Sequence, residues 1–345
     1  MSGGVDSSVA ATLLAGAGDQ VFGLMLRLWS DPDRGVNRCC APEDVVRARQ
    51  TAATLGIPFY VLDAQEPFRE AVVETFVRGY AQGLTPNPCF TCNREIRWGF
   101  LLRQALAMGA THLATGHYAQ TDLRRGSWRL LRGRDPTKDQ SYVLSVLGQH
   151  ELAHALFPLG RMTKHEVRSL ARDRDLPAKD RADSQDLCFL GGGDYRDFLA
   201  DRVPDAHTPG PILNSQGESI GVHAGLSNYT VGQRKGIRLA TPSALYVLEK
   251  RPEANVLVVG PRPALGRSEF PVGDLHWVAG RPPSSLRGLR VQVRYRSPAV
   301  PATIELLKPS QALVRTADPV AEVSPGQGAV FFRGSECLGG GMILP

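Results

Sequence analysis

The start of the chain constrains the fold most strongly. It reads Ser2-Gly3-Gly4-Val5-Asp6-Ser7 and continues as Ser8-Val9-Ala10-Ala11 in a run with helical character. Two glycines permit positive φ and close backbone approach, two serines supply hydroxyls, and the following helix directs its first amides at the loop. This combination predicts an anion site for phosphate, of a type other than the G-x-x-x-x-G-K-[ST] loop. The alternative is a glycine-rich turn before a capped helix.

Residues 1–190 alternate apolar runs with helical patterns. Strands are expected at 21–28, 58–62 and 112–115, and helices at 42–55, 68–82, 94–108, 140–147 and 163–174. This order predicts an α/β fold, a doubly wound parallel sheet with helices on both faces. Ligands of such sheets bind beyond the C-terminal strand ends, where the Ser2 loop, Leu26 and Gly116 would lie. Because only Met1 precedes the loop, we expect an apolar strand supplied by several further N-terminal residues.

The character of the sequence changes in its second half. From Pro209 onward glycine and proline are frequent and helical periodicity fades. Short alternating runs, typical of small β modules, occur at 246–248, 256–259, 289–295, 302–307, 312–316 and 329–332. We therefore expect domain boundaries near 196–208 and 262–267.

Composition and charge indicate what partners, cellular location and cysteine chemistry to expect. The chain has 345 residues and a formal net charge of +6, which slightly favours a polyanionic partner such as nucleic acid. There is no run of 18 apolar residues and no basic-then-apolar leader, so we expect no membrane span and a cytoplasmic location. Six cysteines are too few for a disulfide framework in a chain of this length, and Cys-x-x-Cys in a cytosolic protein indicates metal binding or redox chemistry.

Cys89 and Cys92 carry the clearest signal for a reactive thiol. They follow the rigid segment Thr85-Pro86-Asn87-Pro88 and precede an expected helix. A helix N-terminus with Arg94 and Arg97 nearby is expected to lower the pKa of the Cys92 thiol. The alternative is a structural metal knuckle or two buried thiols.

The other cysteines are less informative. Cys188 lies between the polar run Asp183-Ser184-Gln185-Asp186 and a triple glycine, which favours a loop and a role as redox partner of Cys92. An inert core position is the alternative for Cys188. We expect no catalytic role for Cys39 and Cys40, and a core position for Cys337.

Two basic segments could contact nucleic acid. Lys138, Asp139 and Gln140 place charged and amide groups at an expected helix start. Gln233, Arg234 and Lys235 lie in a glycine-bounded basic turn after Tyr229. The alternatives are an ordinary helix cap and a solvated β-turn, and each segment alone favours the alternative.

Together these strings resemble the bacterial tRNA-specific 2-thiouridylases, a family of ATP pyrophosphatases, over nearly the whole chain. Seven strings in this order make the resemblance specific. They are Ser-Gly-Gly-Val-Asp-Ser at 2–7, Thr-Pro-Asn-Pro-Cys-x-x-Cys-Asn at 85–93, Ala-Thr-Gly-His-Tyr at 114–118, Lys-Asp-Gln-Ser-Tyr at 138–142, Asp-Ser-Gln-Asp-x-Cys-Phe at 183–189, Gly-Gln-Arg-Lys-Gly at 232–236 and Cys-Leu-Gly-Gly-Gly at 337–341.

The resemblance implies three domains and a reaction. The domains would be an ATP-binding catalytic domain at 1–200, a small tRNA-contacting domain at 201–265 and a β-barrel at 266–345. ATP and Mg²⁺ would adenylate the C2 carbonyl oxygen of the wobble uridine, with Cys92 as nucleophile and Cys188 as persulfide carrier. The implied partners are tRNA and a sulfur donor protein, either a cysteine desulfurase or a sulfur relay protein, and the implied state is a monomer.

The resemblance also implies site residues. The ATP site would comprise Ser2, Gly3, Gly4, Val5, Asp6, Ser7, Leu26 and Gly116. The target base would lie against Asn87, Pro88 and Cys89, and tRNA would contact His117, Lys138, Asp139, Gln140, Gln233, Arg234, Lys235, Arg294, Tyr295 and Gln327.

One departure from the family pattern leaves the mechanism open. Position 89 is Cys, where better-known relatives have Asp. Cys89, Cys92 and Cys188 could therefore hold an iron–sulfur cluster that binds sulfide, in place of the persulfide route. Two rival functions are another adenylating ATP pyrophosphatase and a zinc-stabilised RNA-binding protein.

Overall fold

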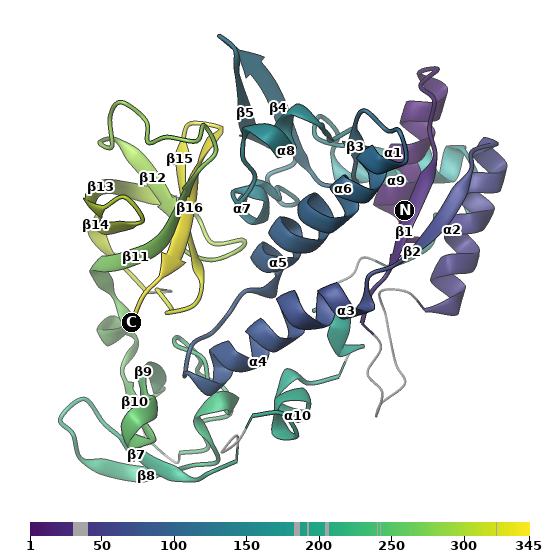
Figure 1. Cartoon of the computed structure of the whole chain (residues 1–345). Coiled ribbons are helices and arrows are strands. Elements are labelled where there is room, and N and C mark those ends of the chain that lie inside the picture. Colours follow the sequence, from purple (N-terminus) through teal and green to yellow (C-terminus); the bar gives the residue numbers. More distant parts are fainter. Residues whose placement is uncertain are drawn as a thin grey trace.

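The computed structural model describes residues 1–29, 41–182, 187–191, 193–203, 207–239, 241, 243–321 and 323–345. Cys39, Cys40 and the run 183–186 lie outside the described residues. Figure 1 shows three parts, with an α/β region at the N-terminus, a small β region below it and a C-terminal barrel beside it. Among the described residues, no helix combines the length and apolar character that a bilayer crossing requires.

The N-terminal region has the expected parallel pairing. Strand β1 (Gly23–Arg27) pairs in parallel with β2 (Phe59–Asp63), and β3 (Leu113–Ala114) pairs in parallel with β6 (Ala155–Leu156). In the described chain these are two separate pairs, and the Met1 amino group donates to the Leu24 carbonyl on β1. The remaining helices of this region are α1 (Val5–Gly16), α2 (Pro42–Leu55), α7 (Ser141–Leu144), α8 (Gln149–Ala153), α9 (Lys164–Asp173) and α10 (Tyr195–Ala200).

Local sequence signals explain the end of α2 and the start of α9. Gly56 ends α2 in the left-handed conformation, at φ +67°. Thr163 caps α9 in a capping box with Glu166, so the predicted helix is confirmed.

Two long helices contain π-helical segments. The first comprises α3 (Gln65–Phe68), a π-helical turn at Arg69–Val73 and α4 (Glu74–Ala81). The second comprises α5 (Pro88–Thr91), a π-helical segment at Cys92–Leu101 and α6 (Leu102–Ala107). This second helix begins at Pro88, earlier than predicted, because Asn87 accepts the Cys89 amide and proline suits the first turn.

A hairpin that the sequence did not signal links the α/β region to the barrel. Strands β4 (Ala119–Arg124) and β5 (Ser127–Arg132) are joined by Arg125 and Gly126, both at positive φ. Two positive φ angles define the type I′ turn, which Asn-Gly usually signals and Arg-Gly does not. Leu130 and Leu131 of β5 pair with Cys337 and Glu336 of the barrel.

The small central region is a four-stranded sheet in the order β8-β7-β10-β9. These strands are β7 (Gly210–Leu213), β8 (Ser219–His223), β9 (Tyr246–Arg251) and β10 (Val256–Gly260), and β10 packs at its centre with every residue buried. The strands expected at 246–248 and 256–259 are confirmed, whereas β7 and β8 were not predicted.

The C-terminal strands close into a barrel, because β11 pairs with both β14 and β16. The strand order is β11-β14-β13-β12-β15-β16. The bounds are β11 (Arg267–Trp277), β12 (Leu289–Gln292), β13 (Val300–Lys308), β14 (Gln311–Val320), β15 (Gly328–Arg333) and β16 (Glu336–Ile343). One apolar cluster continues from the α/β region into the barrel, since Trp98, Tyr142 and Leu144 pack with Val330 and Phe332. This shared core fixes the barrel against the second long helix.

The triple glycine of β16 permits the close approach of its two neighbouring strands, β11 and β15. A Cβ on Gly340 would lie closer than 3.0 Å to the Ala329 carbonyl oxygen of β15, and the neighbouring Gly339 has φ +130°. We predict that Gly340→Ala lowers the free energy of unfolding by about 2 kcal/mol or more, because backbone must shift to admit the methyl group. Thermal or urea unfolding measures this change. Gly16→Ala, where nothing lies within 4 Å of the added carbon, is the control. Equal stability of both variants would contradict this account of the barrel.

Candidate functional site

The N-terminal loop has the geometry of an anion site. The Ser2 amide donates to Ser7 Oγ over 3.1 Å, and the two serine hydroxyls lie 3.2 Å apart. Gly3 has φ +66°, and a Cβ there would lie 2.5 Å from the Asp44 carbonyl oxygen. Helix α1 starts after Gly4 without a side-chain cap, so its first-turn amides stay available to a phosphate. The glycine-rich turn of the alternative is present but no side chain caps α1, and phosphate binding by this loop stays a prediction.

Gly116 borders this loop, as the sequence predicted for it. A Cβ on Gly116 would lie 2.9 Å from the Asp6 carbonyl carbon and 3.0 Å from the Ser7 amide. Leu26 lies at the end of β1 and packs against the apolar cluster that also contains Cys92. Gly116 thus lies against the loop and Leu26 against the thiol cluster, while their roles toward ATP stay predictions.

Sequence reasoning missed the partners of Asp6. Tyr118 donates its hydroxyl to Asp6 Oδ1 over 2.8 Å, and Lys164 donates its ammonium to the same oxygen over 2.6 Å. The motif Gly-His-Tyr and the Thr163 capping box locate these residues in the sequence, but neither signal indicates that they meet Asp6.

A buried carboxylate, that of Asp44, is linked to the loop through Arg181. Asp44, whose side chain is 1% exposed, forms ion pairs with Arg47 and Arg181. Arg181 also donates to the Ser2 carbonyl over 3.4 Å. The loop is therefore tied to both α2 and the segment after α9.

The three cysteines of interest lie in two neighbouring elements. Cys89 occupies the exposed first turn of α5, and Cys92 follows one turn later in a buried position. Cys188 packs against the cluster that contains Cys92 and Phe189. All three are free thiols. The charge of Cys188 raises the pKa of both Cys89 and Cys92, so the three thiols lie within electrostatic reach of one another.

The predicted lowering of the Cys92 pKa is wrong. Burial raises the pKa of the Cys92 thiol to about 11, and burial of the Cys89 sulfur among protein atoms raises its pKa to about 12, although Cys89 as a residue is exposed. The reason is that burial disfavours the charged thiolate of Cys92, which lies one turn inside its helix, beyond the N-terminal amides. Arg97 opposes the increase through its charge and a hydrogen bond to Cys92, whereas Arg94 makes no such contribution.

The π-helical segment explains why Arg97 reaches Cys92. Hydrogen bonds of a π-helix join residues five apart, which places Cys92 and Arg97 on successive turns of the same face. The charge of Arg97 also lowers the pKa of His117, the neighbour of Gly116. Arg97 is therefore within electrostatic reach of both the thiols and His117.

The described residues do not form a metal centre. Within these ranges, no three His, Cys, Asp or Glu side chains come close enough together to hold a metal ion. The thiols interact electrostatically, but their arrangement does not fit a cluster ligand set.

His117, expected to contact tRNA, is buried at 8% exposure. Its Nδ1 lies 2.8 Å from Thr115 Oγ1, and its ring meets Phe157 edge-on. Burial, with a smaller effect from Arg97, lowers the pKa of His117 to about 3.

The predicted tRNA contacts at 138–140 have internal partners. Asp139 pairs with Arg132 over 2.6 Å and accepts the Ser141 amide over 3.1 Å. Gln140 accepts the Tyr118 amide over 3.0 Å. The helix-cap alternative therefore describes Asp139 well, and a tRNA contact for Lys138, Asp139 and Gln140 stays a prediction.

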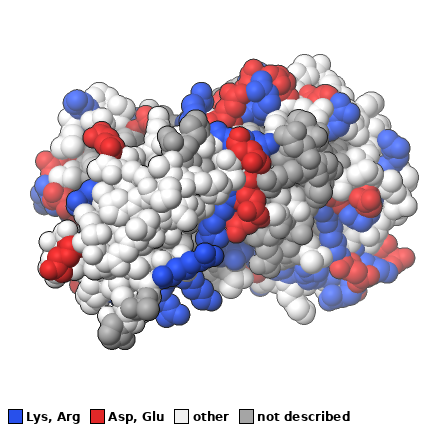
Figure 2. Space-filling model, turned by 90° about the horizontal axis from the view of Figure 1, so that it is seen from below, with Lys and Arg blue, Asp and Glu red and all other residues white. Residues whose placement is uncertain are grey.

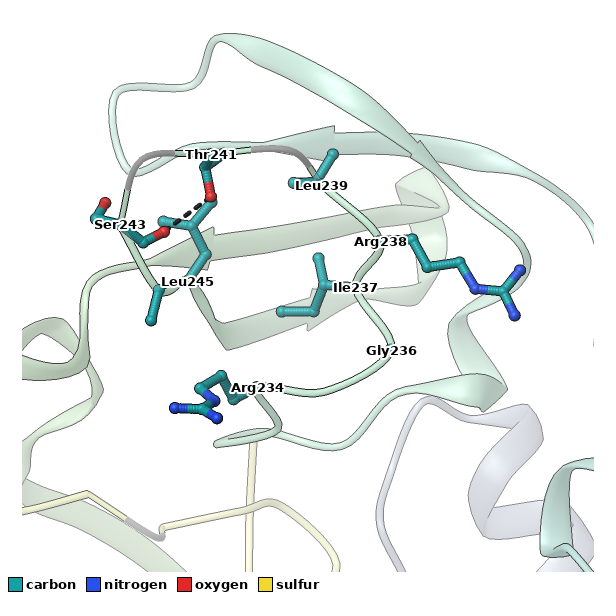
Figure 3. A pocket seen from close by; sticks show the side chains of 9 residues that line it. Arg234, Gly236, Ile237, Arg238, Leu239, Thr241, Ser243 and Leu245 are labelled. Carbon is teal, nitrogen blue, oxygen red and sulfur yellow. Dashed lines mark hydrogen bonds between the residues drawn. The ribbon is translucent and has the colours of Figure 1, made fainter.

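The glycine-bounded turn of the central region presents two cations. Gln233 shapes the turn, because its side chain accepts the Thr230 amide and donates to the Lys235 carbonyl. Arg234 and Lys235 are exposed. Arg234 borders a recess of about 280 Å³ that Ile237 and Leu245 also line (Figure 3). Figure 2 shows Lys and Arg side chains gathered near the middle of one face.

The barrel brings other predicted contacts to the start of α5. Gln327 is buried and donates to the Thr85 carbonyl over 2.7 Å. The ring centres of Tyr295 and Tyr142 are 6.2 Å apart, and those of Tyr142 and Phe90 are 5.0 Å apart. Arg294 is close enough to influence the pKa of Tyr142. Asn87, Pro88 and Cys89 thus face the junction of all three regions.

Lys250 of β9 completes this junction and was not predicted. Its ammonium donates to the Leu84 carbonyl over 3.1 Å and lies 5.6 Å from the centre of the Tyr80 ring. Burial lowers the pKa of Lys250 to about 7.

Comparison with known proteins supplies a family. Residues 1–192 match the tRNA methyl transferase HUP domain, 196–261 the tRNA methyl transferase PRC-barrel domain, and 267–343 the aminomethyltransferase beta-barrel domain. A tRNA-specific 2-thiouridylase MnmA from Chloroflexus aurantiacus is 47% identical over 99% of this chain and 96% of its own length. Proteins of the same name from Magnetococcus marinus and Moorella thermoacetica are 44% and 42% identical, over 100% and 99% of this chain and 97% and 98% of their own.

The buried His117 predicts a pH dependence of stability. Its pKa is about 3 in the folded chain and near 6.5 when unfolded, so unfolding takes up a proton below pH 6.5 and stability falls as pH falls. Between pH 7 and pH 5, the free energy of unfolding of the parent should fall by about 2 kcal/mol more than that of the His117→Asn variant. Urea unfolding at both pH values measures the difference. The exposed His112→Asn is the control, and an unchanged pH dependence in His117→Asn would refute the assignment.

Proposed function

The chain belongs to the tRNA-specific 2-thiouridylase family, and we propose that it catalyses ATP-dependent 2-thiolation of the wobble uridine of tRNA. One observation carries the proposal. Arg97 acts on Cys92 and on His117, and the adjacent Gly116 packs on the start of the phosphate loop. One cation thus acts on the thiol Cys92 and on the neighbour of the glycine that packs on the loop, which supports a site where adenylation is followed by sulfur transfer.

The first step activates a poor leaving group. The uridine O2 attacks the α-phosphorus of ATP, which enters with Mg²⁺, and pyrophosphate departs with the electron pair of the broken P–O bond. Ser2 to Ser7 supply hydroxyls and α1 supplies amides for the phosphates. The product is a uridine whose C2–O bond can break with AMP as leaving group.

The second step moves sulfur. A persulfide on Cys188 delivers its outer sulfur to C2, and AMP leaves with the C–O electron pair. The Cys92 thiolate then attacks the Cys188 sulfur, so that the S–S bond breaks, the thiolated base is released and a Cys92–Cys188 disulfide remains. An external thiol reduces this disulfide, and a sulfur donor protein, a cysteine desulfurase or a relay protein, recharges Cys188. Burial raises the pKa of the Cys92 thiol. The charge and hydrogen bond of Arg97 oppose this increase and so favour the thiolate in this step.

The alternative route uses an iron–sulfur cluster on Cys89, Cys92 and Cys188. Among the described residues no three His, Cys, Asp or Glu side chains are placed to hold a metal ion, and the iron content of the active protein decides between the two routes. In the persulfide route Cys89 contacts the target base together with Asn87 and Pro88.

Cysteine variants test the proposed function. We expect Cys92→Ser and Cys188→Ser to lose thiolation at least about 1,000-fold while a first turnover of pyrophosphate formation persists, because adenylation precedes sulfur transfer. Cys89→Ser should keep at least about a tenth of the activity. The assay measures 2-thiouridine, AMP and pyrophosphate from unmodified tRNA, ATP and a sulfur donor, alongside the iron content of anaerobic protein. Cys337→Ala, outside the thiol cluster, is the control.

Three outcomes would redirect the assignment. Thiolation that depends on Cys89 and on bound iron would establish the cluster route. Full activity of Cys92→Ser would favour another adenylating pyrophosphatase. Stoichiometric zinc with RNA binding indifferent to ATP would favour an RNA-binding protein without this activity.

The exposed turn of the central region predicts a salt effect. Arg234→Gln with Lys235→Gln should weaken tRNA binding and reduce the slope of log affinity against log salt by about two, since each phosphate contact releases about one counterion. Filter binding at several salt concentrations measures the slope. Arg287→Gln with Lys308→Gln removes equal charge from exposed barrel positions. An equal change of this slope in both double variants would show that the turn does not contact tRNA.

A further inference from the structure

Lys250 of β9 carries a charge that the stability of the fold does not explain. Its ammonium donates to the Leu84 carbonyl over 3.1 Å and lies 5.6 Å from the centre of the Tyr80 ring. Burial lowers the pKa of Lys250, and no carboxylate in the described part of the chain raises that pKa in return. A cation buried without an opposite charge costs free energy, which an apolar side chain of similar volume would avoid. The ammonium therefore indicates a role other than stability.

The acceptor of this bond lies just before the expected site of the target base. Leu84 precedes Asn87 and Cys89, which are expected to contact that base. The residue before Leu84 also meets the central region, because a Cβ on Gly83 would lie 2.2 Å from Pro252 Cγ. The central region thus contacts two consecutive residues of this segment, and a shift of β9 would move the start of α5.

The same strand is bonded to the exposed turn of the central region. The Gly232 amide donates to the Val247 carbonyl over 2.8 Å, and the Val247 amide donates to the Gln233 carbonyl over 2.9 Å. Val247 is fully buried in the apolar core of this region. Strand β9 therefore connects the turn that presents two exposed cations to the lysine that holds the segment before α5.

We propose that Lys250 is a positioning residue that links the turn expected to bind tRNA to the segment expected to receive the target base, an inference that rests on the proposed function. When the turn binds the tRNA backbone, β9 sets where Leu84 lies. Leu84 in turn sets where Asn87 and the thiols of the second long helix stand relative to the base. An ammonium suits this role, because a charged donor holds its acceptor more strongly than a neutral one. Lys250 itself contacts neither the base nor the reacting sulfur.

The experiment compares Lys250→Met and Lys250→Arg with Lys308→Met, which removes the same group from an exposed strand position of the barrel. Steady-state thiolation of unmodified tRNA, with ATP and a sulfur donor, gives kcat and the KM for tRNA. Hydrogen exchange followed by mass spectrometry gives the protection of the amides of residues 84–91 and needs no substrate. Thermal unfolding reports whether each variant folds.

We expect Lys250→Met to lower kcat at least about tenfold, because the base and the thiols are no longer held in register. Its KM for tRNA should change by less than about twofold, since the cations of the turn are untouched. Amides of residues 84–91 should exchange at least about tenfold faster, while those of α9 keep their parental rates. Lys250→Arg should recover part of both effects, and Lys308→Met should match the parent.

Two results would overturn the inference. One is a folded Lys250→Met with parental kcat or with parental exchange in residues 84–91. The other is an equal increase in exchange over the whole chain, because a general loss of stability is not a positioning effect. A parent that forms no 2-thiouridine would instead refute the proposed function, and the exchange of residues 84–91 would still decide whether Lys250 positions this segment.

Discussion

The structure depends on how the segment before α5 is held by all three regions of the chain. Lys250 of the central region binds the Leu84 carbonyl, and Gln327 of the barrel binds the Thr85 carbonyl. The Thr85 amide donates to the Pro325 carbonyl over 2.9 Å. These bonds fix the start of the helix that carries Cys89 and Cys92, so the position of both thiols follows from the docking of domains far away in sequence. Removing one buried partner would leave a carbonyl or amide unsatisfied, which costs about 1–3 kcal/mol.

The thiol site shows a conflict between packing and reactivity. Cys92 contributes to the apolar cluster with Phe189, and that burial favours the neutral thiol. A nucleophile needs the thiolate, and Arg97 is the group that opposes burial. The π-helical segment brings Arg97 onto the face of Cys92, which explains an unusual helix geometry at this place.

Local features of the fold could be predicted from sequence, and pairings across the chain could not. The Ser2–Ser7 loop, the Gly56 helix end and the parallel strands follow from short motifs and periodicity. The hairpin at Arg125-Gly126 lacks the usual turn signal, so it was missed. Lys164 and Asp6 are 158 positions apart, and no local pattern indicates their contact. The raised Cys92 pKa was missed for the same reason, since burial is a property of the folded chain.

The predicted tRNA contacts divide into two physical groups. Asp139, Gln140 and Gln327 use their polar atoms within the protein, so their effect on tRNA would pass through the shape of the site. Arg234 and Lys235 are exposed on a turn that Gln233 holds in shape. Exposed cations position a phosphate backbone without reading sequence. Under the proposed function, tRNA affinity would therefore reside in the exposed turn and base selection around α5. The segment before α5, which the central region and the barrel both hold, would connect the two.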